Sequence, residues 1–473
     1  MNYLGFDLGA ESGRAMLGRL SDGVLEVEEL HRFPNTPVEA EGALYWDTTR
    51  LWQEIQRGIR IATEDCQVEL QGIGIDTWGV DYGLLGADGQ LVEQPRHYRD
   101  RRTDGVMELV FARVGRAEIF AQTGVQFLPL NALYQLYAGS RALSSARKLL
   151  NMPDLFNYWL TGEAKSEITI ASTTQFFDPR RMQWATGLFR ALDLPETILC
   201  PLVAPGTLLG KMLAAPGAPV YATASHDTAA AVAAVPAEDR DSWCYVSSGT
   251  WSLIGVELDA AVMTEECLRL NYTNEVGAGG KIRLLKNIAG LWLVQECRRA
   301  WSREGADYTY EELTRLAAEA SPFAAVIDPD AFAEPGAMPG RIAAFCRHSG
   351  QEPPRSHAQT VRVILESLAL RYREVLEGLE RLTSRKIETI HIVGGGARNG
   401  LLNQLVADCT QRRVVVGPYE AAATGNILIQ AMDLREARAV VRRSFATRVV
   451  EPRPNPEWDR AYERLRGLLR ANP

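Results

Sequence analysis

Residues 3–14 read YLGFDLGAESGR, and the expected fold of the first part of the chain follows from this stretch. A short apolar run ends at Asp7, and a small-residue turn separates it from a second apolar run, so a strand, a tight turn and a second strand are predicted. Gly9 and Gly13 let the backbone approach a ligand closely, and the N–H groups of the turn with the Ser12 hydroxyl can bind phosphate oxygens. A carboxylate at a strand end can hold Mg²⁺, often through water. The alternative interpretation is a plain β-hairpin with a surface turn.

The same strand–turn–strand pattern recurs near residue 249. Trp243–Val246 is an apolar run, the polar turn SSGT spans 247–250, and Trp251–Val256 is a second apolar run. The hydroxyls and N–H groups of this turn can cradle a second phosphate position. An ordinary Ser-Gly turn is the alternative for this motif alone. No repeat of short period occurs, and a charged segment at 235–240 between apolar blocks marks a plausible domain boundary.

The other predicted elements alternate only loosely between strands and helices. GIGIDT at 72–77 is a strand that also ends in a carboxylate, and Asp47 or Thr48 can cap a helix that runs to about Cys66. Three strands, a helix and two strands in this order differ from the strict alternation of a Rossmann domain. Further predicted strands are Ala15–Leu20, Val24–Leu30, Tyr82–Leu85, Ile282–Leu285, Thr389–Val393 and Val414–Val416, and further predicted helices lie at 361–383, 401–409, 422–432 and within 454–470.

Three consecutive glycines at 394–396 follow a predicted strand and precede a predicted helix. Consecutive glycines cost conformational entropy, so close packing against something flat is expected. A nucleotide base or ribose fits this expectation, and so does a tight crossing of strand and helix. No GxGxxG or GxxxxGK[ST] motif occurs, so neither a Rossmann nor a Walker phosphate loop is predicted.

The segment ASHDTAA at 224–230 joins a His-Asp pair to small residues. It predicts a polar turn that opens a helix, with Asp227 near the helix N-terminus, where the carboxylate stays ionised and can accept a proton from a hydroxyl. A simple N-cap is the alternative. A Ser/His/Asp hydrolase is disfavoured because no GxSxG motif occurs and contiguous residues rarely form a triad.

The composition of the 473 residues is that of an ordinary globular chain, with 46% hydrophobic and 23% charged residues. A formal net charge of −8 without a basic block argues against binding to nucleic acid or to an anionic membrane surface. No apolar run reaches a membrane-spanning length and no secretory signal is visible, so a cytoplasmic location is expected. The seven cysteines are scattered without a CxxC pair, which argues against a disulfide framework or a zinc site.

Two phosphate loops in two halves of one chain, with a glycine-rich segment suited to adenosine, indicate the actin/hexokinase/Hsp70 class of ATPase. The chain resembles the FGGY family of carbohydrate kinases over nearly its whole length, residues 1–430. General family motifs are DLGAESGR at 7–14, MPDLFNYWLTGE at 152–163, ITIASTTQFFD at 168–178 and HIVGGGARN at 391–399. More specific motifs are GIDTWGVDYGLL at 74–85, YRDRRTDG at 98–105, GVQFLPLNALYQL at 124–136, ASHDTAAAV at 224–232, YVSSGTWSLIG at 245–255 and LLKNIAGLWLVQE at 284–296.

The resemblance implies an α/β chain of two RNase H-like domains with an active-site cleft between them. The N-terminal domain, 1–238, would bind the sugar and carry the first phosphate loop and the catalytic aspartate. The C-terminal domain, 239–473, would carry the second phosphate loop and bind adenosine.

The reaction implied by the resemblance is ATP-dependent phosphorylation of L-rhamnulose at its 1-hydroxyl, in L-rhamnose degradation. A related ketose such as L-fuculose or L-xylulose is the alternative acceptor. The expected partners are ATP and a small ketose, with Mg²⁺ as cofactor, no nucleic acid or membrane partner, and a monomer or homodimer as the assembly. A chaperone- or actin-like ATPase would lack a sugar-dependent increase in ADP release, and a non-catalytic sugar-binding regulator is disfavoured by the presence of Asp227 and both loops.

The site residues are also implied by the resemblance, position by position. Asp227 matches the family's catalytic base, and Asp7 would lie near the metal. Residues expected to face the sugar are Gly79, His226, Asp227, Thr228 and Asn287. Residues expected to contact ATP are Ala10, Glu11, Ser12, Gly13, Arg14, Thr250, Gln295, Gly395 and Gly396. Trp78 and Tyr82 either form an apolar wall for the methyl group of the sugar or are core aromatics.

Overall fold

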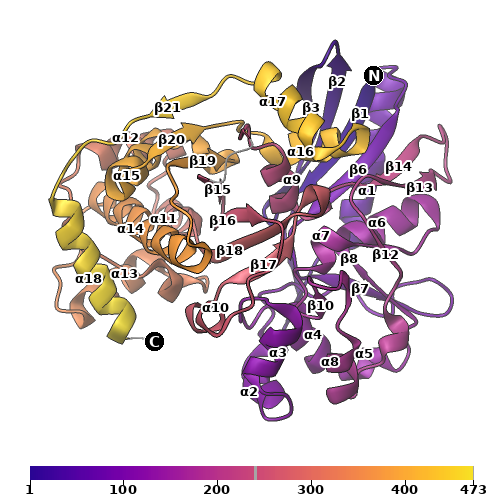
Figure 1. Ribbon diagram of the computed structural model, residues 1–473, viewed down its shortest axis with the longest axis horizontal. Coiled ribbons are helices and arrows are strands. Elements are labelled where there is room, and N and C mark those ends of the chain that lie inside the picture. Colours follow the sequence, from indigo (N-terminus) through magenta and orange to yellow (C-terminus); the bar gives the residue numbers. More distant parts are fainter. Residues whose placement is uncertain (239–241, 472–473) are drawn as a thin grey trace. The chain divides into compact units, whose positions relative to one another are not determined.

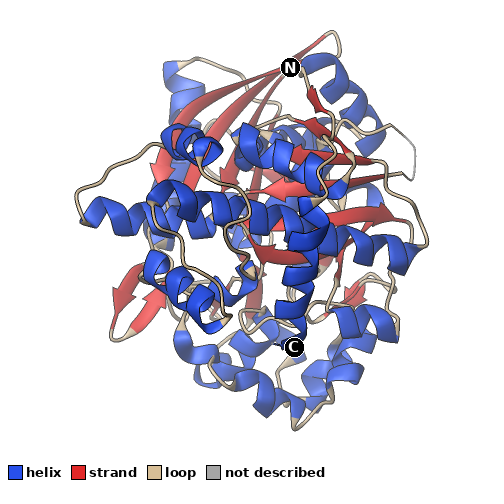
Figure 2. Cartoon of the chain, turned by 90° about the vertical axis from the view of Figure 1, so that its left-hand side faces the viewer, coloured by secondary structure: helices blue, strands red, loops and turns tan. Residues whose placement is uncertain are grey.

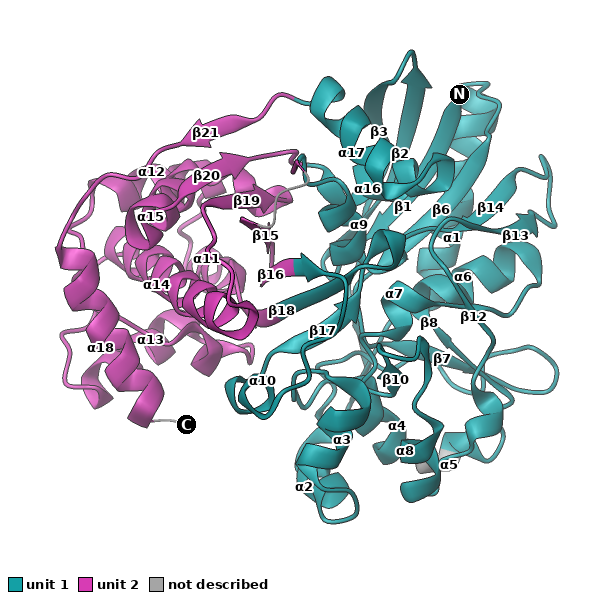
Figure 3. Ribbon diagram, in the orientation of Figure 1, with its two compact units in different colours: residues 1–236, 257–285, 420–445 teal, residues 237–256, 286–419, 446–473 magenta. Residues whose placement is uncertain are grey.

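The computed structural model describes residues 1–238 and 242–471, and these form two compact units. Unit 1 contains residues 1–236, 257–285 and 420–445, and unit 2 contains residues 237–256, 286–419 and 446–473 (Figure 3). The expected boundary between 238 and 239 adjoins residues 239–241, which lie outside the described residues, so a division at that point stays a prediction. Helices and strands both occur along the chain (Figure 2), and each unit contains both, which confirms the predicted α/β class.

A six-stranded sheet organises unit 1, with the strand order β13-β14-β6-β1-β2-β3 (Figure 1). β1 runs antiparallel to β2 and parallel to β6, so the opening motif forms the predicted hairpin. Because β1 and β6 are parallel, their carboxyl ends meet at the same edge of the sheet. The strands are β1 (Asn2–Leu8), β2 (Ser12–Ser21), β3 (Val24–Pro34), β6 (Gly72–Thr77), β13 (Thr207–Lys211) and β14 (Pro219–Ala222).

The two faces of this sheet differ in side-chain size, because successive residues of a strand point to opposite faces. On one face, Phe6 and its apolar neighbours form a buried core with α1 (Thr48–Arg60) and α6 (Met152–Thr161). On the other face, glycines leave room for α16 (Ala421–Ala431), since a β-carbon on Gly74 would lie 2.5 Å from Asn426 Oδ1. This helix therefore lies close to the strand ends that carry Asp7 and Asp76.

Helix α9 (Asp227–Ala233) packs against α16, and a glycine makes the close crossing possible. A β-carbon on Gly425 would lie 1.8 Å from the carbonyl oxygen of Ala230. Helix α9 begins at Asp227, and the sequence predicts this residue near a helix N-terminus, so the crossing sets the position of the expected catalytic residue. The other α-helices in unit 1 are α2 (Val106–Phe111), α3 (Arg116–Thr123), α4 (Ala132–Ala138), α5 (Ser140–Leu143), α7 (Ile168–Ala171), α8 (Thr186–Ala191), α10 (Glu265–Leu270) and α17 (Leu434–Ser444).

Short strands complete unit 1 outside its main sheet. β7 pairs antiparallel with β8, and the strand pair β17–β18 forms an antiparallel hairpin. These strands are β4 (Val38–Ala40), β5 (Ala43–Tyr45), β7 (Tyr82–Leu85), β8 (Lys148–Asn151), β9 (Ser166–Glu167), β10 (Phe177–Asp178), β11 (Gln183–Trp184), β12 (Leu202–Val203) and β17 (Thr273–Val276).

Unit 2 contains most of a second sheet, whose full strand order is β17-β18-β16-β15-β19-β20-β21. β17 and parts of β16 and β18 belong to unit 1. β15 runs antiparallel to β16 and parallel to β19, so the second motif repeats the arrangement of β1, β2 and β6. The strands are β15 (Trp243–Ser248), β16 (Trp251–Leu258), β18 (Ile282–Ala289), β19 (Thr389–Val393), β20 (Arg413–Val416) and β21 (Arg448–Val450). The helices are α11 (Trp292–Arg303), α12 (Tyr310–Glu319), α13 (Met338–His348), α14 (His357–Thr383), α15 (Gly400–Thr410) and α18 (Glu457–Ala471).

The predicted elements occur at or near their expected bounds, with differences of length in several of them. The strand predicted at Ala15–Leu20 begins at Ser12, the strand predicted at Val24–Leu30 extends to Pro34, and the helix predicted at 361–383 begins at His357. The helix predicted to reach about Cys66 ends as an α-helix at Arg60 and continues as a π-helical turn, Ile61–Asp65. The strand predicted at Ile282–Leu285 extends to Ala289. Among the described residues, no helix combines the length and the apolar character needed to cross a bilayer.

Candidate active site

The carboxyl ends of β1 and β6 bring charged side chains of three neighbouring strands together. In register, Asp7 of β1 pairs with Arg14 of β2 on one side and with Asp76 of β6 on the other. The Arg14 guanidinium forms ion pairs with Asp7 and with Glu420, which directly precedes α16. Although burial opposes its charge, the two carboxylates raise the pKa of Arg14 above its ordinary value. The expected metal residue and the last residue of the expected phosphate loop are therefore in direct contact.

Asp76 belongs to this cluster, although it is not among the site residues expected from the sequence. Its side chain is fully buried, and burial together with the charge of Asp7 raises its pKa well above the ordinary aspartate value. Asn426 Nδ2 donates to Asp76 Oδ2 over 2.6 Å, whereas Oδ1 has no hydrogen-bond partner among the described residues. The available signal is the strand GIGIDT, which ends in a carboxylate as the first strand does.

The turn between β1 and β2 is braced by a buried amide. Asn35 donates from Nδ2 to the Gly9 carbonyl over 2.9 Å, and its N–H donates to the Glu11 carbonyl over 2.9 Å. A β-carbon on Gly13 would lie 2.3 Å from the Phe33 ring, so a larger residue does not fit there. The residues of the turn, 9–12, are only half-buried.

Asp227 is the first residue of α9 and lies at the same edge of the sheet. The preceding residue, His226, forms a parallel bridge with Thr77 at the end of β6. The Asp227 side chain is 31% exposed and accepts a hydrogen bond from Thr228 Oγ1 over 3.1 Å. Burial and the charge of Asp7 raise its pKa to about 7. The sequence predicts a fully ionised carboxylate at this helix start, but the low-dielectric surroundings instead produce a group that exchanges its proton near neutral pH.

A buried carboxylate behind this turn holds its backbone. Glu167 accepts hydrogen bonds from the Ser225 N–H over 3.2 Å and from the Thr169 N–H over 2.8 Å. The Thr169 hydroxyl donates to Glu167 over 2.5 Å and accepts from the His226 N–H over 3.2 Å. Sequence reasoning does not identify Glu167 or Thr169, because only the fold brings them beside the turn that ends at Asp227.

We expect Glu167 to make the stability of the protein depend on pH. Burial raises its pKa from 4.5 to about 7 in the folded chain. The folded state therefore binds the proton more tightly than the unfolded state, so stability falls as the pH rises from about 4.5 to 7 and then levels off. Glu167→Gln removes this ionisation, and the difference in unfolding free energy between wild type and variant should change by up to roughly 3 kcal/mol over that range.

Urea unfolding of both proteins, followed by circular dichroism at several pH values, measures this difference. Glu163→Gln is the matched control, because Glu163 is exposed and lies only four residues away in the sequence. Its unfolding free energy should follow the wild-type dependence on pH. A difference between wild type and Glu167→Gln that does not vary with pH would contradict the raised pKa.

The loop after β6 has an unusual backbone conformation beside Gly79. Val80 has a φ of +66°, a left-handed value that costs energy for a β-branched residue. Its N–H donates to Thr173 Oγ1 over 3.0 Å, and a β-carbon on Gly79 would lie 3.2 Å from the same oxygen. Strained backbone of this kind concentrates at ligand sites, which is consistent with the sugar contact expected at Gly79.

Asp81 anchors this loop in the core. Its buried carboxylate accepts hydrogen bonds from the indole N–H groups of Trp46 over 2.6 Å and Trp78 over 2.9 Å, and from Gln135 Nε2 over 2.8 Å. Burial, opposed by these donors, raises its pKa to about 6. Trp78 and Tyr82 are both buried, so the core interpretation applies to both aromatic residues.

In unit 2, the turn between β15 and β16 packs on the start of α11. The N–H groups of Leu291 and Trp292 donate to the carbonyls of Gly249 and Thr250 over 3.0 and 3.2 Å. Gln295 lies one turn further along α11, and its buried Oε1 has no hydrogen-bond partner among the described residues. The structure thus brings two of the expected ATP contacts, Thr250 and Gln295, into one region of unit 2.

The three glycines at 394–396 have different surroundings. Gly394 has a φ of +85°, and a β-carbon on Gly396 would lie 2.2 Å from Ser248 Oγ, so these two residues serve a tight crossing against β15. A β-carbon on Gly395 would meet no other atom within 4 Å, which leaves space for a ligand. Asn287, the remaining residue expected to face the sugar, is half-buried on β18 in unit 2, and its role stays a prediction.

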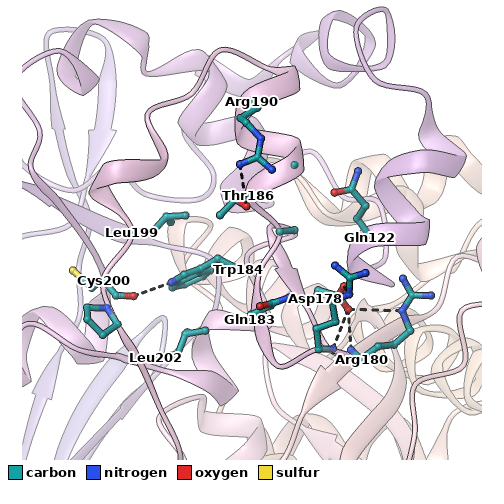
Figure 4. A pocket seen from close by; sticks show the side chains of 14 residues that line it. Gln122, Asp178, Arg180, Gln183, Trp184, Thr186, Arg190, Leu199, Cys200 and Leu202 are labelled. Atoms are coloured by element: carbon teal, nitrogen blue, oxygen red, sulfur yellow. Dashed lines mark hydrogen bonds and ion pairs between the residues drawn. The ribbon is translucent and has the colours of Figure 1, made fainter.

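A cavity of about 650 Å³ in unit 1 is lined by none of the expected site residues (Figure 4). Its lining includes Arg180, Arg181, Arg190 and Asp178. Arg190 pairs with Glu196 at 2.8 Å, and the other two arginines lie 3.7 and 3.9 Å from the Asp178 carboxylate. Because these charges are largely compensated within the protein, we assign the cavity no part in the reaction.

Most of the amino-acid sequence matches a known family. Residues 2–232 match the N-terminal domain of the FGGY family of carbohydrate kinases, and residues 244–434 match its C-terminal domain. The chain therefore belongs to the FGGY family of carbohydrate kinases. Among its curated relatives, the rhamnulokinase of Bacteroides thetaiotaomicron is 44% identical with 99% of each chain covered, and the rhamnulokinase of Bacillus subtilis is 40% identical with 96% of each covered.

Solved structures of other sugar and polyol kinases share the fold. A xylulose kinase from Lactobacillus acidophilus superposes with a TM-score of 0.79 at 14% sequence identity, covering 99% of this chain and 96% of the other. A glycerol kinase from Plasmodium falciparum, solved with ADP, gives a TM-score of 0.76 at 14% identity, covering 99% of this chain and 98% of the other. At these identities the likeness establishes the fold alone.

Proposed function

We propose that the protein transfers the γ-phosphoryl group of ATP to the 1-hydroxyl of L-rhamnulose, forming L-rhamnulose 1-phosphate and ADP. Relatives that are rhamnulokinases, 40% and 44% identical over nearly the full length, support this substrate over L-fuculose or L-xylulose. The structural observation that carries the proposal is Asp227, a carboxylate at a helix start whose pKa is raised to about 7. A general base works best when its pKa lies near the working pH.

In the proposed reaction, ionised Asp227 accepts the proton of the 1-hydroxyl as that oxygen attacks the γ-phosphorus. A bond forms between the sugar oxygen and phosphorus, the bond from phosphorus to the bridging oxygen breaks, and ADP leaves. The transition state of phosphoryl transfer is largely loose, so positioning and charge neutralisation supply most of the acceleration. Arg14 and the N–H groups of the turns at 9–12 and 247–250 are proposed to contact the phosphate oxygens.

The residues present fit a Mg²⁺ ion held by one or two carboxylates. Mg²⁺ usually keeps several waters and binds together with substrate phosphates rather than in a closed protein cage. Asp7 and Asp76 are neighbours in register, and Asp76 Oδ1 is an acceptor without a partner among the described residues. Among the described residues, no group of three or more His, Cys, Asp or Glu side chains is suited to hold a metal alone. When bound, the ion neutralises charge on the phosphate oxygens.

Asp7→Asn should weaken the dependence of the reaction on Mg²⁺ more than it weakens sugar binding. Loss of a carboxylate ligand should raise the Mg²⁺ concentration needed for half-maximal activity by about tenfold or more. Titrating Mg²⁺ while following ADP release measures this change, and calorimetry measures sugar binding. Asp22→Asn, in an exposed turn, is the control and should behave as wild type. An unchanged Mg²⁺ titration in Asp7→Asn would remove Asp7 from the proposed metal site.

A coupled assay of ADP release tests the proposed function directly. The purified protein is given ATP and Mg²⁺ with L-rhamnulose, L-fuculose, L-xylulose or glycerol in turn. We expect the highest kcat/KM with L-rhamnulose and residual activity on related ketoses, because one methyl group contributes only about 1–3 kcal/mol of discrimination. A higher kcat/KM on another ketose would reassign the substrate, and ADP release that no sugar increases would overturn the assignment as a sugar kinase.

We further propose that the enzyme works in the cytoplasm, where ATP is available. The seven cysteines are all free, and six of them are buried. Free thiols are the usual state in a reducing compartment. Whether the protein is a monomer or a homodimer stays a prediction that gel filtration with light scattering can test.

A further inference from the structure

A line of buried polar side chains lies behind the proposed base in unit 1. Glu275 of β17 and Arg283 of β18 are direct partners in the antiparallel hairpin. The Arg283 side chain is fully buried, and those of Glu275 and His226 are only 5% and 7% exposed. His226 in turn precedes Asp227, so the line runs from Glu275 through Arg283 and His226 to the proposed base.

The contacts of His226 favour one of its two tautomers. Arg283 Nη2 lies 3.0 Å from His226 Nδ1 and 3.1 Å from Glu275 Oε2. A guanidinium can only donate hydrogen bonds, so a hydrogen bond between Nη2 and Nδ1 has Nδ1 as its acceptor. The same Nη2 also donates to the Val276 carbonyl over 3.2 Å, so its two N–H groups face three acceptors. Glu275 Oε2 is also 3.4 Å from Nδ1 and could accept a proton from it, but this distance is longer and Glu275 already pairs with Arg283.

Burial and the positive charge of Arg283 lower the pKa of His226 well below its ordinary value, which favours the neutral ring. A neutral imidazole carries one proton, so Nδ1 as acceptor leaves that proton on Nε2. His226 Nε2 lies 3.4 Å from Asp227 Oδ1, the same oxygen that accepts the Thr228 hydroxyl hydrogen bond. Both of these contacts are made by Oδ1, which leaves Oδ2 to receive a proton in the proposed reaction.

We propose that Arg283 is a positioning residue for this kinase, holding His226 in the tautomer that is protonated on Nε2 and so presenting a donor to Asp227 Oδ1. The effect of this tautomer on the reaction rests on the proposed function, whereas the assignment of the tautomer does not. Arg283 acts through His226, and its charge also opposes the rise in the pKa of Asp227. Arg283 directly precedes the motif at 284–296, but the sequence gives no sign of this role, because His226 and Arg283 are 57 residues apart.

Nitrogen NMR of the full chain with ¹⁵N-labelled histidine tests the tautomer without any ligand. The chain has six histidines, and the His226 signals are those missing from the spectrum of His226→Gln. We expect protonated Nε2 and unprotonated Nδ1, unchanged between about pH 6 and 8, because the ring stays neutral there. A ring protonated on Nδ1, which would donate to Glu275, would overturn the proposal, as would a ring that titrates in this range.

Variants of Arg283 test whether the tautomer of His226 affects turnover. The double variant Arg283→Met with Glu275→Gln removes the donor without leaving an unpaired buried charge, and Arg283→Lys keeps a charged donor. In the double variant we expect mixed tautomers of His226 and a kcat lower by roughly 10- to 100-fold with the KM for ATP little changed. Arg283→Lys should keep His226 mostly protonated on Nε2 and should retain most of the wild-type kcat. A double variant with the wild-type tautomer and wild-type kcat would overturn the role of Arg283.

Two further outcomes keep this proposal separate from the assignment of the reaction. If the double variant does not fold, the wild-type spectrum alone decides whether the tautomer is correct. If the wild type phosphorylates no ketose but shows the expected spectrum, the proposed function fails while the assignment of the tautomer stands.

Discussion

Asp227→Asn should lower kcat by roughly 10²–10⁴-fold, the usual contribution of a general base. The amide has nearly the shape of the carboxylate and can still accept the hydrogen bond from the Thr228 hydroxyl. It cannot take up a proton from the sugar, so the loss should appear in turnover. Calorimetry with the sugar and with ATP should show affinities within a small factor of wild type, because the contacts of both substrates are retained.

Wild-type activity should also fall as the pH drops below about 7, because the pKa of Asp227 is raised to about 7 and its protonated form is not a base. Stopped assays of ADP formation across this range, at saturating ATP and sugar, measure the change. Asp193→Asn is a suitable control, since the Asp193 side chain is 78% exposed and pairs with Arg113 on the surface. A kcat for Asp227→Asn within tenfold of wild type would assign proton transfer to another group.

Gly425→Ala should strongly destabilise unit 1 and reduce turnover together. A β-carbon at this position would lie 1.8 Å from the Ala230 carbonyl oxygen, a backbone atom that cannot rotate away. Helices α9 and α16 would have to move apart, at a cost of about 3 kcal/mol or more, beyond the ordinary range for an overpacked core. Because α9 begins at Asp227 and α16 carries Asn426 beside Asp76, the displacement should also disturb the proposed base.

Differential scanning calorimetry and the ADP-release assay measure the two effects of Gly425→Ala. Gly467→Ala is the matched control, since Gly467 also lies in a helix, α18, but has nothing within 4 Å of the new β-carbon. There the better helix propensity of alanine should raise stability by up to about 1 kcal/mol. Equal unfolding temperatures for Gly425→Ala and wild type would mean that the crossing of α9 and α16 is looser than the structure indicates.

Local sequence patterns predict the elements of this protein well where apolar runs are bounded by turn residues. The strands at 72–77, 82–85 and 389–393 have the predicted ends, and Asp227 lies at a helix N-terminus as predicted. The two strand–turn–strand motifs are also recognisable from the residues alone, because each combines short apolar runs with a turn of small polar residues. These signals are local, since they depend on neighbours within one strand or one helical turn.

The α/β class, the two hairpin motifs and a helix N-terminus near Asp227 can all be predicted from the amino-acid sequence, because backbone preference and side-chain alternation act over a few residues. The fold alone brings Glu420 and Asn426 beside Asp7 and Asp76, and Arg283 behind His226. Contacts between residues so far apart in the chain depend on strand order and helix packing, which no short pattern encodes. The same distinction applies to Asp227. Its place near a helix N-terminus follows from neighbouring residues in the sequence. The rise of its pKa to about 7 comes from burial and from the charge of Asp7, which only the folded chain brings near.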